Sequence, residues 1–251
     1  MNIDLLAIAA HPDDVELACA GTMLMNKRAG KRTGILDFTR GELSTRGTLE
    51  TRARETEAAT KILQLDYRAN LEMPDANIEL SQENLRKVIV QIRKTRPTIL
   101  LAPSREERHP DHEAAAELAR RAAFYAGLVK IETKDEAGNP QEPHRPLLLL
   151  HYLQGHHVES TIIVDITPVF EERMKAVDAY ASQFDGNRMP GDDLSNRKRE
   201  TVLSQPGFVD GIRARAAYYG RRIGTRYAEP FWSPEPLGTR DVFSLVTKTI
   251  A

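Results

Sequence analysis

The 251-residue sequence contains a single cysteine, Cys19, so it cannot form an intrachain disulfide. A lone cysteine is compatible with a reducing compartment. No apolar run approaches the roughly 18–20 residues that a bilayer-spanning helix needs, and the N-terminus lacks the basic and long apolar regions of a secretory signal. These absences predict a soluble cytoplasmic protein with no membrane partner.

An excess of charge of one sign is also missing. The 35 basic and 36 acidic residues give a formal net charge of −1, which gives no sign of a nucleic-acid partner. The chain has no Gly-x-Gly, so it lacks the phosphate-binding turn of nucleotide-binding Rossmann folds. Hydrophobic residues make up 41% of the chain, which argues against disorder. The length suits one domain spanning residues 1–251.

Apolar runs that suit buried strands alternate with helical patterns along the chain. This alternation implies parallel strands joined by right-handed crossovers. We therefore expect an α/β fold with a Rossmann-like, doubly wound, mostly parallel sheet of order 3-2-1-4-5 and helices on both faces. The expected strands are 4–9, 33–39, 68–71, 98–102, 147–153 and 161–166. The expected helices are 15–29, 49–65, 81–94, 110–125, 168–182 and 196–219, the last interrupted near Pro206-Gly207.

Two clusters of histidine and aspartate follow expected strands. The first is His11-Pro12-Asp13-Asp14, after strand 4–9, and the second is His109-Pro110-Asp111-His112, after strand 98–102. Such groups are costly to bury unless they are paired or bound to metal. In the expected strand order the two strands are neighbours, so both clusters lie at the same edge of the sheet. Either cluster alone could be an ordinary turn, but together they predict one divalent metal site.

These residues carry a family resemblance. The string Ala10-His11-Pro12-Asp13-Asp14, paired with His109-Pro110-Asp111-His112, resembles the LmbE/PIG-L family of metal-dependent N-deacetylases. Weaker strings appear in the order expected of the branch that deacetylates N-acetylglucosaminyl-malate in bacillithiol synthesis. These strings are 39–42, 45–48, 73–75, 145–146, 164–167, 180–184 and 227–231.

The resemblance implies a set of site residues. His11, Asp14 and His112 are the expected metal ligands, and two imidazoles with one carboxylate leave a position for water, as catalytic zinc requires. Zinc is the first expectation and ferrous iron the second. The resemblance makes Asp13 the general base, with a turn residue or a partner of the ligands as the alternative. His109 as an imidazolium would stabilise the oxyanion; alternatively, it is only a local helix cap.

Arg52, Asp75 and Arg145 match positions that the family associates with the substrate pocket. Asp75 could accept sugar hydroxyls, and an arginine can hold a carboxylate through two hydrogen bonds. The alternatives are a solvated helix residue for Arg52 and a loop charge for Arg145.

Three features outside this set have weaker interpretations. Asp111 could orient a histidine or simply favour the positive end of a helix. His156 and His157 suggest a second metal site, but adjacent histidines point opposite ways on a strand, so we interpret them as exposed loop residues. Residues 184–193, rich in glycine, aspartate and asparagine, predict a mobile loop.

The expected function is zinc-dependent hydrolysis of the acetamide of an N-acetylglucosaminyl conjugate. N-acetylglucosaminyl-malate is the first choice, and a chitooligosaccharide or another amino-sugar conjugate is the alternative. A non-catalytic metal-binding protein or a nucleotide-binding Rossmann-like module is a rival from a different class. The expected partners are a small-molecule substrate and, because the family often assembles, further copies of the chain in a homo-oligomer.

Overall fold

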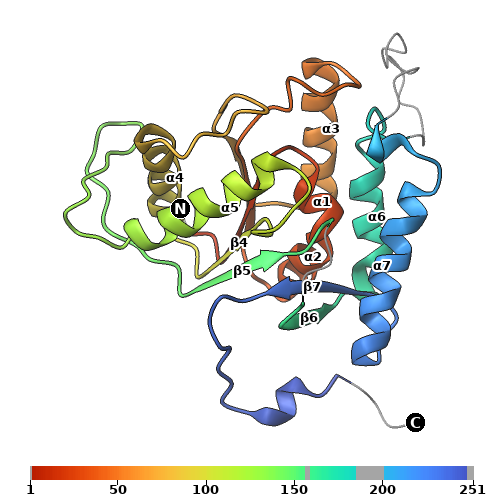
Figure 1. The fold of residues 1–251 in the computed structure, drawn as a ribbon. Helices are drawn as coiled ribbons and strands as arrows, with labels where there is room; N and C mark the ends of the chain where they lie inside the picture. Colours follow the sequence, from red (N-terminus) through yellow and green to blue (C-terminus); the bar gives the residue numbers. More distant parts are fainter. Residues whose placement is uncertain (1, 156–158, 185–200, 248–251) are drawn as a thin grey trace.

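The computed structural model describes residues 2–155, 159–184 and 201–247 of the chain. Its strands are β1 (Leu5–Ala9), β2 (Thr33–Asp37), β3 (Tyr67–Asn70), β4 (Ile99–Ala102), β5 (Leu148–Tyr152), β6 (Ile162–Asp165) and β7 (Ala228–Trp232). They form one sheet of order β3-β2-β1-β4-β5-β7-β6 (Figure 1). Neighbours from β3 across to β5 pair in parallel, whereas β7 is antiparallel to both β5 and β6.

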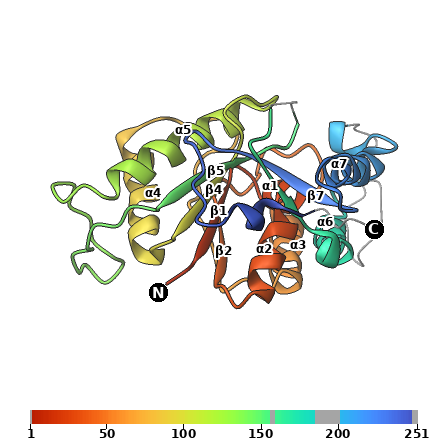
Figure 2. The ribbon, with the colours of Figure 1, turned by 90° about the horizontal axis from the view of Figure 1, so that it is seen from below.

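Helices cover both faces of this sheet. They are α1 (Asp14–Ala18), α2 (Ala20–Arg28), α3 (Leu49–Ile62), α4 (Gln82–Thr95), α5 (Pro110–Tyr125), α6 (Phe170–Asp178) and α7 (Phe208–Ile223). Short 3-10 helices are η1 (Thr167–Val169), η2 (Val202–Ser204) and η3 (Val242–Leu245). Figure 2 shows α4 and α5 on one side of the sheet and α2, α3 and α6 on the other.

Strand β1 contributes side chains to both hydrophobic cores. Leu5, Ala7 and Ala9 pack in the core shared with α1, α2 and α6. Leu6 and Ile8 pack in the core shared with α4 and α5. Successive side chains of a strand point to opposite faces, so a strand covered on both faces is apolar at every position. The continuous apolar run predicted this burial correctly.

The predicted α/β fold and its order 3-2-1-4-5 are confirmed. Strand β7, which joins β6 to the sheet at the β5 side, was not expected from the sequence. Pro230 lies in the middle of β7 and has no N–H for a ladder, so residues 228–232 do not resemble a strand. This strand turns the last part of the sheet from parallel to antiparallel.

The predicted helix 15–29 is two helices that meet at Cys19, where φ is −142° and ψ is 14°. The break leaves the first backbone N–H groups of α2 without partners inside the helix. The Glu229 carboxylate on β7 accepts two of them, from Gly21 at 2.9 Å and from Thr22 at 2.7 Å. A carboxylate at the positive end of a helix is stabilising. Strand β7 is thereby fixed to α2.

Several predicted features lie wholly or partly outside the described residues. They are His156, His157, nearly all of the expected loop 184–193 and the start of the expected helix 196–219. Within the described part of that helix, η2 is followed by a break at Pro206-Gly207 and then by α7, as the sequence suggested. Among the described residues, no helix combines the length and apolar character needed to span a bilayer.

Candidate metal-dependent active site

The first functional segment is the connection between β1 and α1. It carries His11 and Asp13, and Asp14 is the first residue of α1. Asp13 has a backbone φ of 126°, which residues other than glycine rarely adopt. Such strain costs on the order of 1–3 kcal/mol and clusters at functional sites. The residue after His11-Pro12 is therefore held in a conformation that an ordinary turn would not need.

The second functional segment is the start of α5, which follows β4. His109 is the N-cap residue, and its Nδ1 accepts the backbone N–H of Asp111 at 3.2 Å. Pro110 is the first helical residue, where its missing N–H costs nothing, as the sequence predicted. Because β1 and β4 are adjacent and parallel, the two segments leave the sheet at the same edge.

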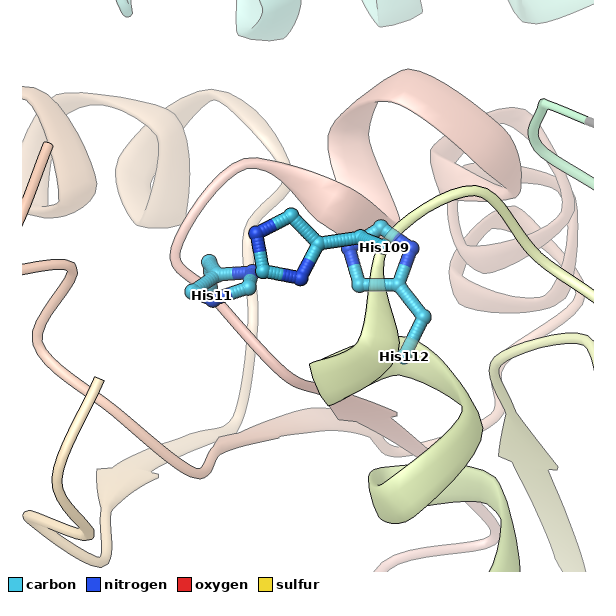
Figure 3. Close-up of side chains that lie close together, drawn as sticks. All are labelled: His11, His109 and His112. Carbon is cyan, nitrogen blue, oxygen red and sulfur yellow. The ribbon is translucent and has the colours of Figure 1, made fainter. Parts of the chain in front are cut away.

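Three imidazoles meet between these segments (Figure 3). The ring centroids of His11 and His109 are 4.7 Å apart, and those of His11 and His112 are 5.5 Å apart. The rings of His109 and His112 stack with centroids 5.2 Å apart. The two clusters of the sequence therefore form one site, although they are separated by nearly a hundred residues.

Asp14 lies between two of the imidazoles. Its Oδ1 is 3.1 Å from Nε2 of His112, and its Oδ2 is 3.7 Å from Nδ1 of His11. The Oδ2 atom also accepts the backbone N–H of His11 at 2.9 Å, which fixes the carboxylate. One carboxylate thus lies beside two ring nitrogens, and donors of these kinds also hold catalytic zinc.

The opposite nitrogen of His11 contacts two carboxylates. Nε2 lies 3.0 Å from Asp75 Oδ1 and 3.2 Å from Asp111 Oδ2. An ionised carboxylate can only accept here, so Nε2 carries a proton, and Nδ1, the nitrogen that faces Asp14, is the one left for a metal. Histidines that bind metal typically donate their other ring N–H to a carboxylate in this way. Asp111 therefore makes the orienting contact that the sequence offered as one of its two interpretations.

Two other sets of donors, neither of which includes Asp14, are close enough to hold a cation. The ring nitrogens of His11, His109 and His112 lie within 4.8 Å of one another, and so do the donor atoms of His11, Asp75 and Asp111. Asp75 and Asp111 are engaged through His11 Nε2 and through backbone N–H groups. His109 is engaged at Nδ1. These engagements favour the set of His11, Asp14 and His112.

Charges within the cluster shift one another's pKa values. Burial lowers the pKa of His11 and His112, but the surrounding carboxylates outweigh burial and raise both pKa values. Burial raises the pKa of Asp14, but the two imidazoles outweigh it and place this pKa well below its ordinary range. The site therefore keeps Asp14 ionised, which is the form that a metal requires.

Asp13 pairs with Arg52, which the sequence had assigned to the substrate. The guanidinium Nη1 donates to Asp13 Oδ2 at 2.8 Å and to the carbonyl of Pro12 at 2.7 Å, while Nη2 donates to Ser44 Oγ at 2.7 Å. Burial raises the pKa of Asp13 to about 6, and Arg52 opposes this shift. Arg52 lines the cavity, and its contacts fix the position of the Asp13 carboxylate.

Asp75 contacts His11 and also lines the cavity. It accepts the backbone N–H of Leu43 at 2.9 Å and of Ala76 at 2.8 Å. A carboxylate has about four acceptor positions, so these three donors leave room for another. The geometry gives Asp75 a part in orienting His11, and its contact with sugar hydroxyls stays a prediction.

The structure does not bring Arg145 to the site. Its guanidinium lies 4.2 Å from the ring centroid of Phe124 and donates to the Phe124 carbonyl at 3.1 Å. Phe124 is near the C-terminal end of α5, whereas His109 and His112 are at its N-terminal end. Arg145 is absent from the described residues that line the cavity, so we do not retain it as a substrate ligand.

The cluster opens into a cavity of about 300 Å³. Among its polar walls, Thr45 and Gln183 lie in the strings 45–48 and 180–184 that carried the resemblance, whereas Ser44, Gln154 and Thr201 were not expected from the sequence. Gln154 lies 3.4 Å from Asp14 Oδ1 and follows β5. The strand-end rule could have identified Gln154. The others lie on connections whose paths no local pattern predicts.

Comparisons with known proteins agree with this site. A family model described as GlcNAc-PI de-N-acetylase (PIG-L) matches residues 6–123, which include both clusters. The diacetylchitobiose deacetylase of Thermococcus kodakarensis is 29% identical over 235 residues, covering 90% of this chain and 80% of that protein.

Solved structures extend the likeness over the whole fold. The conserved protein TT1542 from Thermus thermophilus is 38% identical with a TM-score of 0.81, covering 94% of this chain and 97% of that one. The N,N'-diacetylchitobiose deacetylase from Pyrococcus horikoshii has a TM-score of 0.72 at 24% identity, covering 91% of this chain and 82% of that one. The second likeness is one of fold.

Proposed function

This chain belongs to the PIG-L (LmbE) family of hydrolytic N-deacetylases, and on that premise we propose that it removes acetate from an N-acetylglucosamine conjugate. The observation that carries the proposal is Asp14, placed between ring nitrogens of His11 and His112, with the Asp13 carboxylate beside it. This arrangement offers ligands and a separate base in one cavity. Both are needed for hydrolysis of an amide.

The residues at the site fit a divalent metal. His11 through Nδ1, His112 through Nε2 and the Asp14 carboxylate would hold it, with zinc as the first candidate and ferrous iron as the second. When bound, such a metal supplies a Lewis acid that polarises the amide carbonyl and acidifies water. A cation would also replace the imidazole protons that Asp14 otherwise stabilises.

Asp13 is the proposed general base. Its carboxylate is held by Arg52 at 2.8 Å, so it keeps a fixed position beside the ligands. The base takes a proton from the attacking water and returns it to the departing amine, whose C–N bond breaks. A pKa of about 6 suits both halves of this transfer, because an acid–base catalyst works best when its pKa is near the operating pH.

His109 is the proposed stabiliser of the oxyanion. Its Nδ1 accepts the Asp111 N–H, so in the neutral ring the proton is on Nε2. Burial and the nearby His11 and His112 lower its pKa. The contact therefore favours a neutral N–H donor over the imidazolium expected from the sequence. A neutral donor fixed in place still stabilises developing negative charge.

N-acetylglucosaminyl-malate remains the first candidate for the substrate. It rests on the branch-specific strings of the sequence and on Arg108 at the cavity wall, which could face a carboxylate. A chitooligosaccharide is the second candidate, favoured by the 29% identity to a protein named diacetylchitobiose deacetylase. The malate conjugate carries two negative charges and the chitooligosaccharide carries none, so charge separates them.

The test measures metal content and acetate release together. We expect about one divalent metal per chain and a much higher kcat/KM for the malate conjugate than for the neutral methyl glycoside of N-acetylglucosamine. Added salt should reduce the preference where exposed charges contribute. Equal kcat/KM values would reject the malate assignment but not the deacetylase. Retained metal without acetate release from any N-acetyl sugar would favour the non-catalytic alternative.

Three broader expectations remain proposals. They are a single domain across residues 1–251, a cytoplasmic location and a homo-oligomer. A monomer mass by light scattering at working concentration would reject the last of these.

A further inference from the structure

A second cavity opens beside the active site. It measures about 230 Å³ and shares His112, Arg108 and Gln154 with the main cavity. Its far wall is formed by α7, which presents Phe208, Ile212 and Arg215. These positions are spaced four and three residues apart, so they lie on one face of the helix. We call this cavity the side pocket.

Arg215 stands in the wall of the side pocket as a cation without a carboxylate partner among the described residues. Its Nη1 donates to the carbonyl of Gln154 and its Nη2 to the carbonyl of Leu17 at 2.6 Å. A guanidinium has five N–H donors, so three are left for other acceptors. Burial lowers the pKa of Arg215 to about 10, and the group is therefore still charged at neutral pH.

The carboxylate in the described lining of the side pocket already has hydrogen-bond donors. Its carboxylate, Glu107, accepts the backbone N–H of Gly155 at 2.8 Å and that of Arg108 at 2.7 Å. Arg108 is exposed where the two cavities meet. The described walls thus combine two guanidinium groups with one carboxylate that backbone donors already hold. This balance favours an anion.

The size of the side pocket identifies which part of a substrate could enter it. An acetyl group has only a methyl beyond its carbonyl and would leave most of the space empty. The aglycone of a glucosaminide is attached to the ring carbon next to the one that carries the acetamide. An aglycone therefore begins within a few bonds of the acetamide, and the side pocket adjoins the active-site cavity at His112, within reach of such a group.

We infer that the side pocket binds a carboxylate of the aglycone and that Arg215, with Arg108, selects anionic glucosaminides over neutral ones. This inference rests on the proposed N-deacetylase function and assigns its specificity to α7. Its loss should therefore raise KM for an anionic substrate more than for a neutral one. Because Arg215 also holds the carbonyls of Leu17 and Gln154, a change shared by both substrates would measure that structural role and not the binding of an anion.

The experiment compares Arg215→Gln with the parent enzyme on N-acetylglucosaminyl-malate and on the neutral methyl glycoside. We expect kcat/KM for the malate conjugate to fall about 10- to 100-fold, the range of a lost charge-assisted hydrogen bond, mostly through KM. The methyl glycoside should change less than about threefold. Arg215→Lys keeps the charge without the fork and should recover part of the preference.

The matched control is Arg222→Gln, an exposed arginine on the same helix that lies over Tyr218. It should behave as the parent does. An undiminished malate preference in Arg215→Gln, or an equal loss on both substrates, would overturn the inference.

Calorimetric binding of free L-malate separates this inference from the proposed function. Should the parent hydrolyse neither substrate, the deacetylase proposal fails, and malate binding still decides on the pocket. Weaker binding to Arg215→Gln than to the parent supports the pocket. Equal affinity, or no binding to either protein, rejects it.

Discussion

Two buried clusters of charge meet at α1, which contributes Asp14 to one and Glu16 to the other, and they have different consequences. In the active site, Asp14 faces His11 and His112, and Asp13 has one arginine. In the second cluster, which we call the Arg68 network, a single guanidinium on β3 holds two carboxylates. Arg68 is 2.7 Å from Glu16 and 2.8 Å from Asp37, and Tyr180 donates to Glu16 at 3.1 Å.

The difference lies in the kind of cation that each cluster contains. The Arg68 guanidinium is permanently charged, and its planar fork matches carboxylates, so both carboxylates have a cation without any ligand. Both clusters border a cavity, but only imidazoles can give up their protons to a metal. Burial of acids beside a cavity is therefore not by itself a sign of function, and the histidines make the difference.

The largest effect is expected when a proposed metal ligand is removed. His112→Ala should lose most of the bound metal and nearly all acetate release, because only one imidazole and one carboxylate would remain. Elemental analysis of the purified variant measures the loss. The control is His144→Ala, whose ring contacts the Pro97 carbonyl outside the site. Metal binding by His112→Ala at the parent's level would mean that the ligand set is wrong.

Removal of the base should be the next largest effect. Asp13→Asn keeps the size of the side chain and can still contact Arg52, but it cannot accept a proton from water. General-base catalysis is typically worth about 10²–10⁴-fold, and we expect a loss of kcat in that range with metal content unchanged. A kcat within a few-fold of the parent would remove Asp13 from the mechanism.

The Arg68 network should respond in stability instead of metal binding. Arg68→Met leaves Glu16 and Asp37 buried without their cation, and breaking a buried pair costs about 3–5 kcal/mol. Urea unfolding should show this decrease in the free energy of unfolding, with metal content of the folded protein retained. The exposed Arg120, paired with Glu117, gives the control, because Arg120→Met should cost about 0–1 kcal/mol. Equal costs for the two variants would erase the distinction between the clusters.

The sequence brought the two histidine–aspartate clusters together and did not indicate the Arg68 network, for a physical reason. The site consists of two local strings, and the expected strand order alone brings them together. Arg68, Glu16, Asp37 and Tyr180 lie on four separate segments, and no spacing along the chain reveals their contact.

The same reason explains which predicted site residues meet in the structure and which do not. His11, Asp14 and His112 sit at strand ends or helix starts, where topology fixes position. Arg52 and Asp75 were found through the resemblance, but the direction of a side chain depends on packing that the sequence does not express. Arg145 follows no expected strand, so topology gave no check on it, and its loop packs against the far end of α5.

The smallest expected effect separates two arginines that the sequence treated alike. Arg145→Gln should leave kcat/KM within about twofold of the parent, since surface changes away from a site seldom matter.

Arg52→Gln should lower kcat, because it releases Asp13, which Arg52 holds at 2.8 Å. It should also move the acidic limb of the kcat profile to higher pH. The sign follows from charge: Arg52 lowers the pKa of Asp13, so its loss raises that pKa, and the base becomes ionised only at higher pH. Kinetics of both variants between pH 5 and 8 measure the contrast, and an activity loss in Arg145→Gln equal to that in Arg52→Gln would return Arg145 to the substrate pocket.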